Sequence, residues 1–324
     1  MSAGPAEQPR TLVIVNPASA GGRTGKRWPA LRGALDTAHI TYDVHHTTAP
    51  RDATAATRDA LTSSYTRVVS CGGDGTLNEV VNGFFAADDA GTPINREAIL
   101  GVLPSGTGGD FRRTTGHPTD PTALAAILAA NHTRRIDAGR ITYDSPATPP
   151  THFINIADCG VGGEVVARVN RSNSKGGGVR GTVVFLVITL KVLTTFGGRP
   201  IRLILDGHSA EMQIDNVVIA NGRYFGGGMR IAPSAELDDG WFDVVVLPAL
   251  GRMRTLVAMP SVYRGAHIKQ PGVLVKRART VRVEPLDNRA LLFDIEGEQI
   301  GIAPATLTCL PGALRLCVPR SAAG

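Results

Sequence analysis

The sequence has few of the residues on which small secreted proteins and nucleic-acid-binding proteins depend. Only four of its 324 residues are cysteines, and none forms a Cys-x-x-Cys pair. A disulfide framework is therefore not expected, and a reduced, intracellular protein is the simpler interpretation. Aromatic residues make up 5% of the chain, and no stretch interleaves them with basic residues, which argues against nucleic-acid binding. The longest apolar run, residues 183–190, is far too short to span a bilayer.

The chain also lacks an apolar segment near its first residue. Residues 1–10 have no apolar core, so a signal peptide is not expected, and the expected location is the cytoplasm. The formal net charge of +6 favours anionic partners such as phosphates or acidic lipid surfaces. The same charge would serve solubility alone, so it does not decide the function.

What the sequence does contain is enough apolar residues for more than one core. Hydrophobic residues make up 43% of the 324 positions, a length at which two domains are the default. In the first part of the chain, short apolar runs alternate with helix-length segments. This alternation predicts an α/β domain whose parallel sheet is covered by helices on both faces. The expected strands are 11–15, 40–46, 67–71 and 99–103, and the expected helices are 24–38, 51–62, 76–87 and 121–130.

The second part consists mainly of short strands divided by turn residues. This pattern predicts a β-rich domain of antiparallel sheets packed as a sandwich. Two segments, 178–196 and 251–263, break the pattern and are expected to be helical. We expect a first domain of residues 1–133 and a second of residues 134–324.

Three glycine-rich stretches follow three of the expected parallel strands: NPASAGGRTG, GGDGT and PSGTGGDF. Ligands of parallel sheets bind beyond the carboxyl ends of the strands. A glycine-rich turn into a helix leaves backbone N–H groups free to face a phosphate. The first stretch is not a P-loop, because Ala20 and Arg27 stand where that motif needs glycine and serine or threonine. We therefore predict a polyphosphate site, with Asp74 holding a metal-bound water or a ribose hydroxyl.

The residues after Asp74 have the pattern of a helix start. Thr76 is expected to cap that helix, with Glu79 completing a capping box. A plain tight turn before a capped helix, with no ligand, is the alternative. The similar Gly-Thr-Asp chemistry of residues 106–110 favours the ligand site.

Together, NPASAGG, GGDGTLNEVVNG and PSGTGGDF resemble the diacylglycerol kinase catalytic-domain family, which includes bacterial lipid kinases, diacylglycerol kinases and sphingosine and ceramide kinases. In the second part, YFGGG with APSAELDDG, and the closing FDIEGEQ, resemble further motifs of that family. The resemblance implies ATP- and Mg²⁺-dependent phosphorylation of a lipid hydroxyl. It also implies an α/β domain like that of NAD kinases and phosphofructokinases, a β-rich lipid-binding domain, and a last segment that packs back toward the first domain.

The resemblance also assigns roles to single residues. The nucleotide is expected to contact hydroxyl, amide and backbone groups of the glycine-rich stretches and of the second strand's end. The sequence departs from the family at Gly109, where asparagine is usual, and this departure leaves the details of that loop open. The residues expected to bind the nucleotide are Asn16, Thr47, Gly72, Gly73, Asp74, Gly75, Thr76, Asn78, Gly106, Thr107 and Asp110.

In the family's closing Asp-Gly-Glu motif, the first carboxylate is the base that takes the proton from the lipid hydroxyl. Glu296 stands there, one methylene longer, and Glu298 matches the glutamate. We expect Glu296, Asp74 and Glu298 to be catalytic, with Glu296 and the nucleotide meeting across the cleft between the domains. Which of the two glutamates is the base stays open. An isolated Glu-Gly-Glu would instead be typical of a solvated hairpin turn.

The segment AELDDGWF raises the question of a metal. The resemblance implies a magnesium ion away from the reaction centre, held by Glu236, Asp239 and Trp241, two of them through backbone carbonyls. A turn before a strand is the simpler interpretation, and the two are compatible. The transferring phosphates need a Mg²⁺ of their own, for which Asp74 is the expected indirect anchor.

A lipid substrate makes residues 176–199 notable, because a basic glycine-rich loop lies there beside an apolar helix. The segment contacts an anionic membrane surface or an acyl chain, or it is a helix that covers the sandwich, and the two are compatible if only its start is exposed. Peripheral membrane contact is therefore expected, and a homodimer is left open.

Two other functions stay open from the sequence. One is a NAD-kinase-like enzyme with a soluble substrate. The other is a nucleotide or lipid sensor that has lost catalysis through Gly109 and Glu296. The acceptor lipid is open as well: diacylglycerol, a sphingoid base, ceramide and a polyketide-like lipid all offer a hydroxyl.

Overall fold

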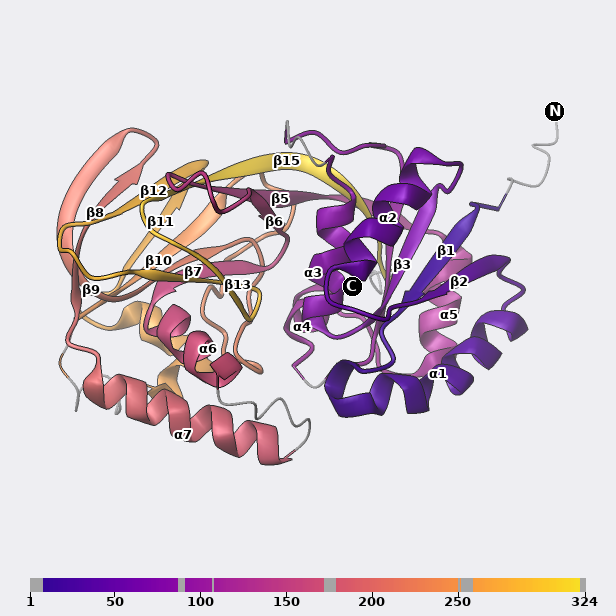
Figure 1. Ribbon diagram of the computed structural model, residues 1–324, viewed down its shortest axis with the longest axis horizontal. Coiled ribbons are helices and arrows are strands. Elements are labelled where there is room, and N and C mark those ends of the chain that lie inside the picture. Colours follow the sequence, from indigo (N-terminus) through magenta and orange to yellow (C-terminus); the bar gives the residue numbers. More distant parts are fainter. Residues whose placement is uncertain are drawn as a thin grey trace. The chain divides into compact units, whose positions relative to one another are not determined.

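The computed structural model describes residues 8–86, 91–106, 108–171, 179–249, 251 and 259–320, apart from the side chains of residues 179–183, 185 and 186. By their contacts the residues group into two compact units (Figure 1). The first comprises Met1–Gly106, Thr115–Arg135 and Ala313–Gly324, and the second comprises Thr107–Thr114 and Ile136–Gly312. Residues 107–114, which the sequence analysis assigned to the first domain, thus group with the second unit.

The first unit is built on a parallel sheet, as the alternation of strands and helices predicted. The order across the sheet is β15-β4-β3-β1-β2, and its described pairs are parallel. The final residues of the chain's last strand join this sheet, with Arg315 and Leu316 beside Ile99 and Leu100. The strands are β1 (Thr11–Val15), β2 (Tyr42–His46), β3 (Arg67–Gly72), β4 (Ile99–Pro104) and β15 (Ala305–Cys317).

Helices cover both faces of this sheet, because its inner strands are buried on both sides. Helices α1 (Ser19–Thr37) and α5 (Pro121–Ala130) lie on one face, and α2 (Asp52–Thr62) and α3 (Asp74–Gly83) lie on the other (Figure 1). On the first face, Leu31 and Leu124 of the helices belong to one buried cluster with Val13 and Val69 of the strands. The α/β prediction is confirmed.

The second unit is rich in strands, and its described pairs are antiparallel, as predicted. The main order is β14-β13-β7-β9-β8-β12-β15, while β10 pairs with β9 and β11, and β5 pairs with β15 and β6. Besides β15, the strands are β5 (Thr133–Tyr143), β6 (Thr151–Phe153), β7 (Ile156–Gly160), β8 (Arg199–Leu205), β9 (His208–Ala220), β10 (Phe242–Pro248), β11 (Leu274–Ala278), β12 (Thr280–Pro285), β13 (Leu292–Ile295) and β14 (Glu298–Ile302).

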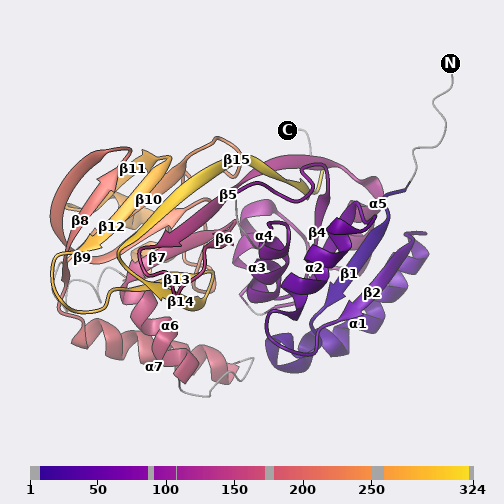
Figure 2. The ribbon, with the colours of Figure 1, turned by 45° about the horizontal axis from the view of Figure 1, so that its top comes forward.

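A large buried cluster lies in this strand-rich unit. Phe153 stacks on Phe242 with ring centroids 5.6 Å apart, and Phe293 and Val281 belong to the same cluster. Helix α6 (Val161–Arg171) packs on β7 and β13, and α7 (Val179–Thr195) packs on α6 (Figures 1 and 2). The helix expected over 178–196 is therefore confirmed, whereas the one expected over 251–263 falls largely outside the described residues.

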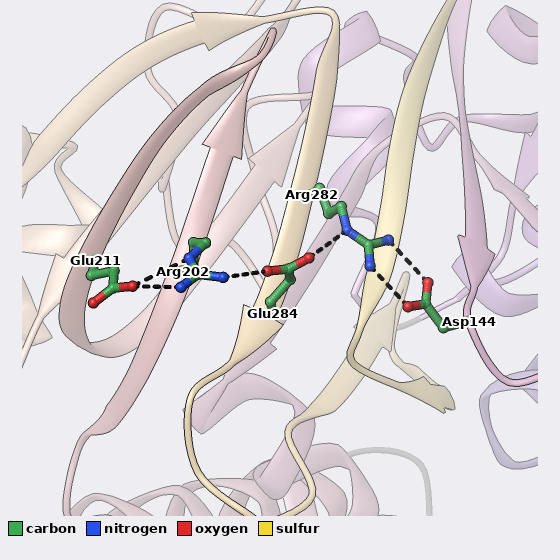
Figure 3. Close-up of polar contacts among 5 residues, drawn as sticks. All are labelled: Asp144, Arg202, Glu211, Arg282 and Glu284. Carbon is green, nitrogen blue, oxygen red and sulfur yellow. Dashed lines mark hydrogen bonds and ion pairs between the residues drawn. The ribbon is translucent and has the colours of Figure 1, made fainter.

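Alternation along β8 and β12 gives the second unit a charged outer face. Ile201, Leu203, Val281 and Val283 point into the core, and their polar neighbours point outward. A chain of ion pairs crosses that face at 2.7, 3.4, 2.8 and 2.8 Å between nitrogen and oxygen atoms (Figure 3). Such cross-strand pairs help to fix the register of the strands. The row of ion pairs runs from Glu211 through Arg202, Glu284 and Arg282 to Asp144.

The remaining named elements are the short helix α4 (Asp110–Thr115) and the 3-10 helix η1 (Ala266–Lys269), and residues 259–263 are helical as well. No helix in the part of the chain that the structure describes is both long and apolar enough to cross a bilayer.

Candidate functional site

The loops at the carboxyl ends of the first unit's strands are joined to one another by backbone hydrogen bonds. Thr47 N–H donates to Val15 (2.9 Å), Asn16 N–H donates to Cys71 (3.0 Å), and Ser105 N–H donates to Gly72 (2.8 Å). The structure therefore brings Thr47, Asn16 and the turns that begin at Gly72 and Ser105 to one edge of the sheet. We call this edge the rim.

Two glycines of the rim leave no room for a side chain. A Cβ on Gly106 would lie 2.6 Å from the Cα of Gly73, and a Cβ on Gly72 would lie 2.5 Å from the hydroxyl of Thr76. The turns after β3 and β4 thus touch backbone to backbone. Any larger residue at Gly106 would push them apart, which explains why glycine is needed there.

Helix α3 starts directly at the rim. Gly73 is extended (φ −91°, ψ −175°), and Asp74 is the first residue of the helix. The predicted capping box is wrong, because the helix begins two residues before Thr76. The Thr76 hydroxyl instead accepts a hydrogen bond from the Asn16 side chain at 3.0 Å. Asp74 is half-buried, and Asn78 is buried on the next turn.

The glycine-rich stretch after β1 has an unusual backbone. Ala20, Gly21 and Gly22 have φ values of 55°, 67° and 86°, all in the left-handed region. An L-residue such as Ala20 pays about 1–2 kcal/mol for that conformation. Strain of this kind concentrates at functional sites. It also explains why the segment does not follow the simple helical pattern, which predicted a start at residue 24.

The structure does not group two of the expected nucleotide-binding residues with the rim. Thr107 lies outside the described residues. Asp110 is buried in the second unit, where its carboxylate accepts a hydrogen bond from Gly227 N–H at 2.8 Å. The structure thus gives Asp110 a role in holding the YFGGG turn, whose three glycines have φ values of 58°, 82° and 112°.

Gly109, which departs from the family pattern, has a φ of 59°. Glycine and asparagine are the residues that most readily adopt this left-handed conformation. The departure therefore keeps the backbone shape that asparagine would permit, although it removes the amide.

Glu296 lies in the tight turn between β13 and β14. Glu296 and Gly297 have φ values of 54° and 90°, the arrangement of a two-residue hairpin turn. The Glu296 Oε1 accepts hydrogen bonds from the backbone N–H groups of Ile154 (2.6 Å) and Asn155 (2.8 Å). These two donors fix the direction of the carboxylate. Glu296 is half-buried, whereas Glu298 is exposed.

The residues that hold this turn were not among those expected from the sequence. Asn155 links the Glu296 carboxylate to the YFGGG segment, because its side-chain amide also donates to the Tyr224 carbonyl at 2.9 Å. Asp294 accepts from Gly297 N–H at 2.7 Å. The available signal was a polar residue inside an otherwise apolar strand, in HFINIADCG and ALLFDIEG.

The expected metal loop lines a cavity of about 560 Å³ in the second unit. Glu236, Asp239 and Asp243 line it together with Lys276 and Arg277. Burial raises the pKa of the Asp243 carboxyl, and the nearby negative charges of Asp239 and Glu236 raise it further, although Ser234 and Arg277 act in the opposite direction. The carboxylate oxygens are donors of the kind that Mg²⁺ prefers, while Lys276 and Arg277 balance two of the three negative charges.

An arginine side chain competes with a metal for the carboxylate of Asp239. Asp239 Oδ2 forms an ion pair with Arg277, and Asp239 Oδ1 accepts from Trp241 N–H at 3.0 Å. The Trp241 ring lies against Arg279 and Arg277, with centroid distances of 4.4 and 5.6 Å. Among the described residues, no three His, Cys, Asp or Glu side chains are gathered as ligands. Any metal here would depend on backbone carbonyls as well.

Two family models match the chain. Residues 10–141 match the diacylglycerol kinase catalytic domain, and residues 156–318 match the YegS C-terminal NAD kinase beta sandwich-like domain. A crystal structure of a diacylglycerol kinase from Bacillus anthracis has the same fold, with a TM-score of 0.69, 20% identity and coverage of 97% of this chain and 98% of that one.

Curated relatives are similar over most of their length. Diacylglycerol kinases from Staphylococcus carnosus and Bacillus subtilis are each 27% identical, covering 96% and 97% of this chain and 95% and 98% of theirs. A diacylglycerol kinase from Mycobacterium tuberculosis is 32% identical and covers 78% of this chain and 77% of its own.

The geometry of the metal loop generates the first prediction. Asp239→Ala should reduce the gain in melting temperature (Tm) that Mg²⁺ or Ca²⁺ produces, because it removes the side-chain ligand. At a hundred times Kd, binding adds about 2.7 kcal/mol, or roughly 5–10 °C for a domain of this size. Arg277→Gln is the matched variant: it removes the competing cation and should enlarge the gain. Equal gains in Tm in the wild type and Asp239→Ala, measured by thermal shift, would show that the loop is a turn without a metal site.

Proposed function

The chain belongs to the diacylglycerol kinase family, and from that premise we propose that it transfers the γ-phosphate of ATP to a lipid hydroxyl with Mg²⁺. Family membership makes it a kinase. The observation that supports ATP as the donor is the backbone contact between Gly106 and Gly73. It places two glycine-rich turns, of the kind that binds phosphates in other proteins, together at the start of α3. The phosphate donor, the metal ion and the acceptor are proposals that go beyond membership of the family.

The rim suits a polyphosphate for electrostatic reasons. The first N–H groups of a helix have no partner within the helix, and together they carry a partial positive charge. The start of α3 lies beside the turns after β1 and β4, so a phosphate chain would meet hydroxyl, amide and N–H donors from several elements. Asp74, on the first turn, would bind the metal through water, and the Mg²⁺ would neutralise charge on the transferring phosphate.

Glu296 supplies the second half of the chemistry in this proposal. The lipid alcohol must lose a proton as its bond to phosphorus forms, and a positioned base typically contributes about 10²–10⁴-fold. The N–H groups of Ile154 and Asn155 hold the Glu296 carboxylate in one direction. Orientation of this kind is what a general base requires before its pKa matters.

We propose a diacylglycerol-like acceptor, because the curated relatives are diacylglycerol kinases. Such a substrate lies in a membrane. Helix α7 exposes Val187 and Leu190, which are 56% and 43% accessible, beside the exposed Lys191. Apolar and basic side chains on one outer helix support peripheral contact with an anionic lipid surface. The basic loop before α7 falls mainly outside the described residues.

The rim yields the second prediction. Asp74→Asn should lower kcat by roughly 10²–10³-fold, the usual cost of losing one electrostatic stabiliser. The Tm should stay within about 2 °C of the wild type, because the substitution preserves shape. Asp59→Asn, on the exposed face of α2, is the control and should keep full activity. Normal lipid phosphorylation by Asp74→Asn would refute the assignment of Asp74.

The third prediction concerns the base. Glu296→Gln keeps an oxygen for the N–H groups of Ile154 and Asn155 but removes the basic group. It should lower kcat by about 10²–10⁴-fold, with little change in ATP affinity measured by calorimetry. Glu298→Gln, a neighbouring and exposed carboxylate, is the control. If Glu298→Gln loses activity while Glu296→Gln keeps it, the base is Glu298. If both keep it, the base lies elsewhere.

A further inference from the structure

Two buried aspartates lie side by side next to the Glu296 turn. Asp294 of β13 and Asp158 of β7 are partners in the antiparallel register. They are 8% and 1% accessible, and as directly opposed residues they project from the same face of the sheet, close enough for their carboxyl groups to interact. Two carboxylates this close cannot both be charged in a buried site, so the pair holds a shared proton.

The surroundings of both carboxyl groups favour a bound proton. Burial raises the pKa of Asp158 well above its ordinary value, and the negative charge of Asp294 raises it further. Burial also raises the pKa of Asp294, to about 7, although the N–H groups of Gly297 and Glu298 act in the opposite direction. Both carboxyl groups therefore favour the protonated form more than an exposed aspartate does.

Hydrogen bonds connect the aspartate pair to the Glu296 turn on one side and to helix α6 on the other. Asp294 accepts from Gly297 N–H at 2.7 Å. The Asn216 amide donates to Asp158 Oδ1 at 3.1 Å, and its oxygen accepts from Gly162 N–H, in the first turn of α6, at 3.3 Å. A Cβ on Gly162 would lie 1.9 Å from Asp158 Oδ1, so α6 closes directly over the pair.

The turn needs such support because its backbone is strained. Glu296 has a φ of 54°, which costs a non-glycine residue about 1–2 kcal/mol. Conformations of this kind persist only where neighbouring contacts enforce them. The bond from Gly297 N–H to Asp294 is one of these contacts. Without it, Glu296 would relax toward a negative φ, and its carboxylate would leave the N–H groups of Ile154 and Asn155.

Resting on the proposed role of Glu296 as the base, we propose that the Asp158–Asp294 pair positions that base. The proton shared by the two carboxyl groups holds β7 and β13 together at this point. Asp294 holds Gly297 N–H, and the turn then aims the Glu296 carboxylate. Neither aspartate contacts the substrate in this account, so both are positioning residues.

The shared proton also links the pair to pH. Both pKa values are raised above that of an unfolded aspartate, about 3.9, so the folded protein holds more protons than the unfolded chain at higher pH. The pair's contribution to stability therefore falls as the pH rises from about 4 through about 7. The groups that face the pair are Asn216 of β9, Gly162 N–H of α6 and Glu298 of β14, whose charge adds to the rise in the pKa of Asp294.

Two substitutions at one position test the proposal. Asp294→Leu removes the acceptor for Gly297 N–H and should lower kcat about a hundredfold, the effect of a small displacement of a catalytic group. The KM for ATP should not change. Asp294→Asn keeps an oxygen for Gly297 and an amide for Asp158, so it should recover most of the rate. It should also weaken the pair's pH-dependent decline in Tm between pH 5 and pH 8, because one of two titrating groups is gone.

Glu296→Gln, measured beside them, separates the possible failures. If Glu296→Gln is inactive but Asp294→Leu has a normal kcat, the positioning role is overturned and the base stands. If Glu296→Gln is fully active, the base assignment fails and this proposal fails with it. Should Asp294→Leu not fold, Asp294→Asn decides. An unchanged dependence of Tm on pH in that variant would contradict a shared proton.

Discussion

The contact between the backbones of Gly73 and Gly106 sets the geometry of the first unit's rim. Two parallel neighbours, β3 and β4, end side by side, and their turns must pass each other before entering the next elements. A Cβ on Gly106 would lie 2.6 Å from Gly73, so only glycine allows the passage. Because the turns touch, the start of α3 lies beside the turn after β4. The proposed polyphosphate site depends on this one steric condition.

In the second unit, hydrogen bonds from glycine N–H groups to carboxylates hold several turns. A buried or half-buried carboxylate accepts a hydrogen bond from the N–H of a glycine in the left-handed region. Each of these bonds gives the N–H of the turn an acceptor that the strand ladder does not provide. Each carboxylate therefore fixes a turn that the backbone alone would not hold. The pairs are Asp110 with Gly227 at 2.8 Å, Asp137 with Gly240 at 2.6 Å and Gly312 at 2.7 Å, and Asp294 with Gly297 at 2.7 Å.

The sequence predicted those parts of this picture that depend on neighbouring residues. Apolar runs located β1 and β3 correctly, and the glycine-rich stretches identified the rim, because periodicity and turn chemistry are local. The start of α3 was wrong, since an extended Gly73 lets the helix begin earlier than the Thr76 pattern indicated. The Asp158–Asp294 pair was missed because it arises from strand register between distant segments. No local pattern encodes that register.

The most direct test of the account is transfer of labelled γ-phosphate from ATP into a panel of acceptors. The acceptors would be vesicles of anionic lipid carrying diacylglycerol, a sphingoid base or ceramide, with NAD as the soluble comparison. The account predicts Mg²⁺-dependent label in the organic-phase product of the diacylglycerol vesicles. Label in NAD alone, or binding of ATP without label in any lipid, would contradict it.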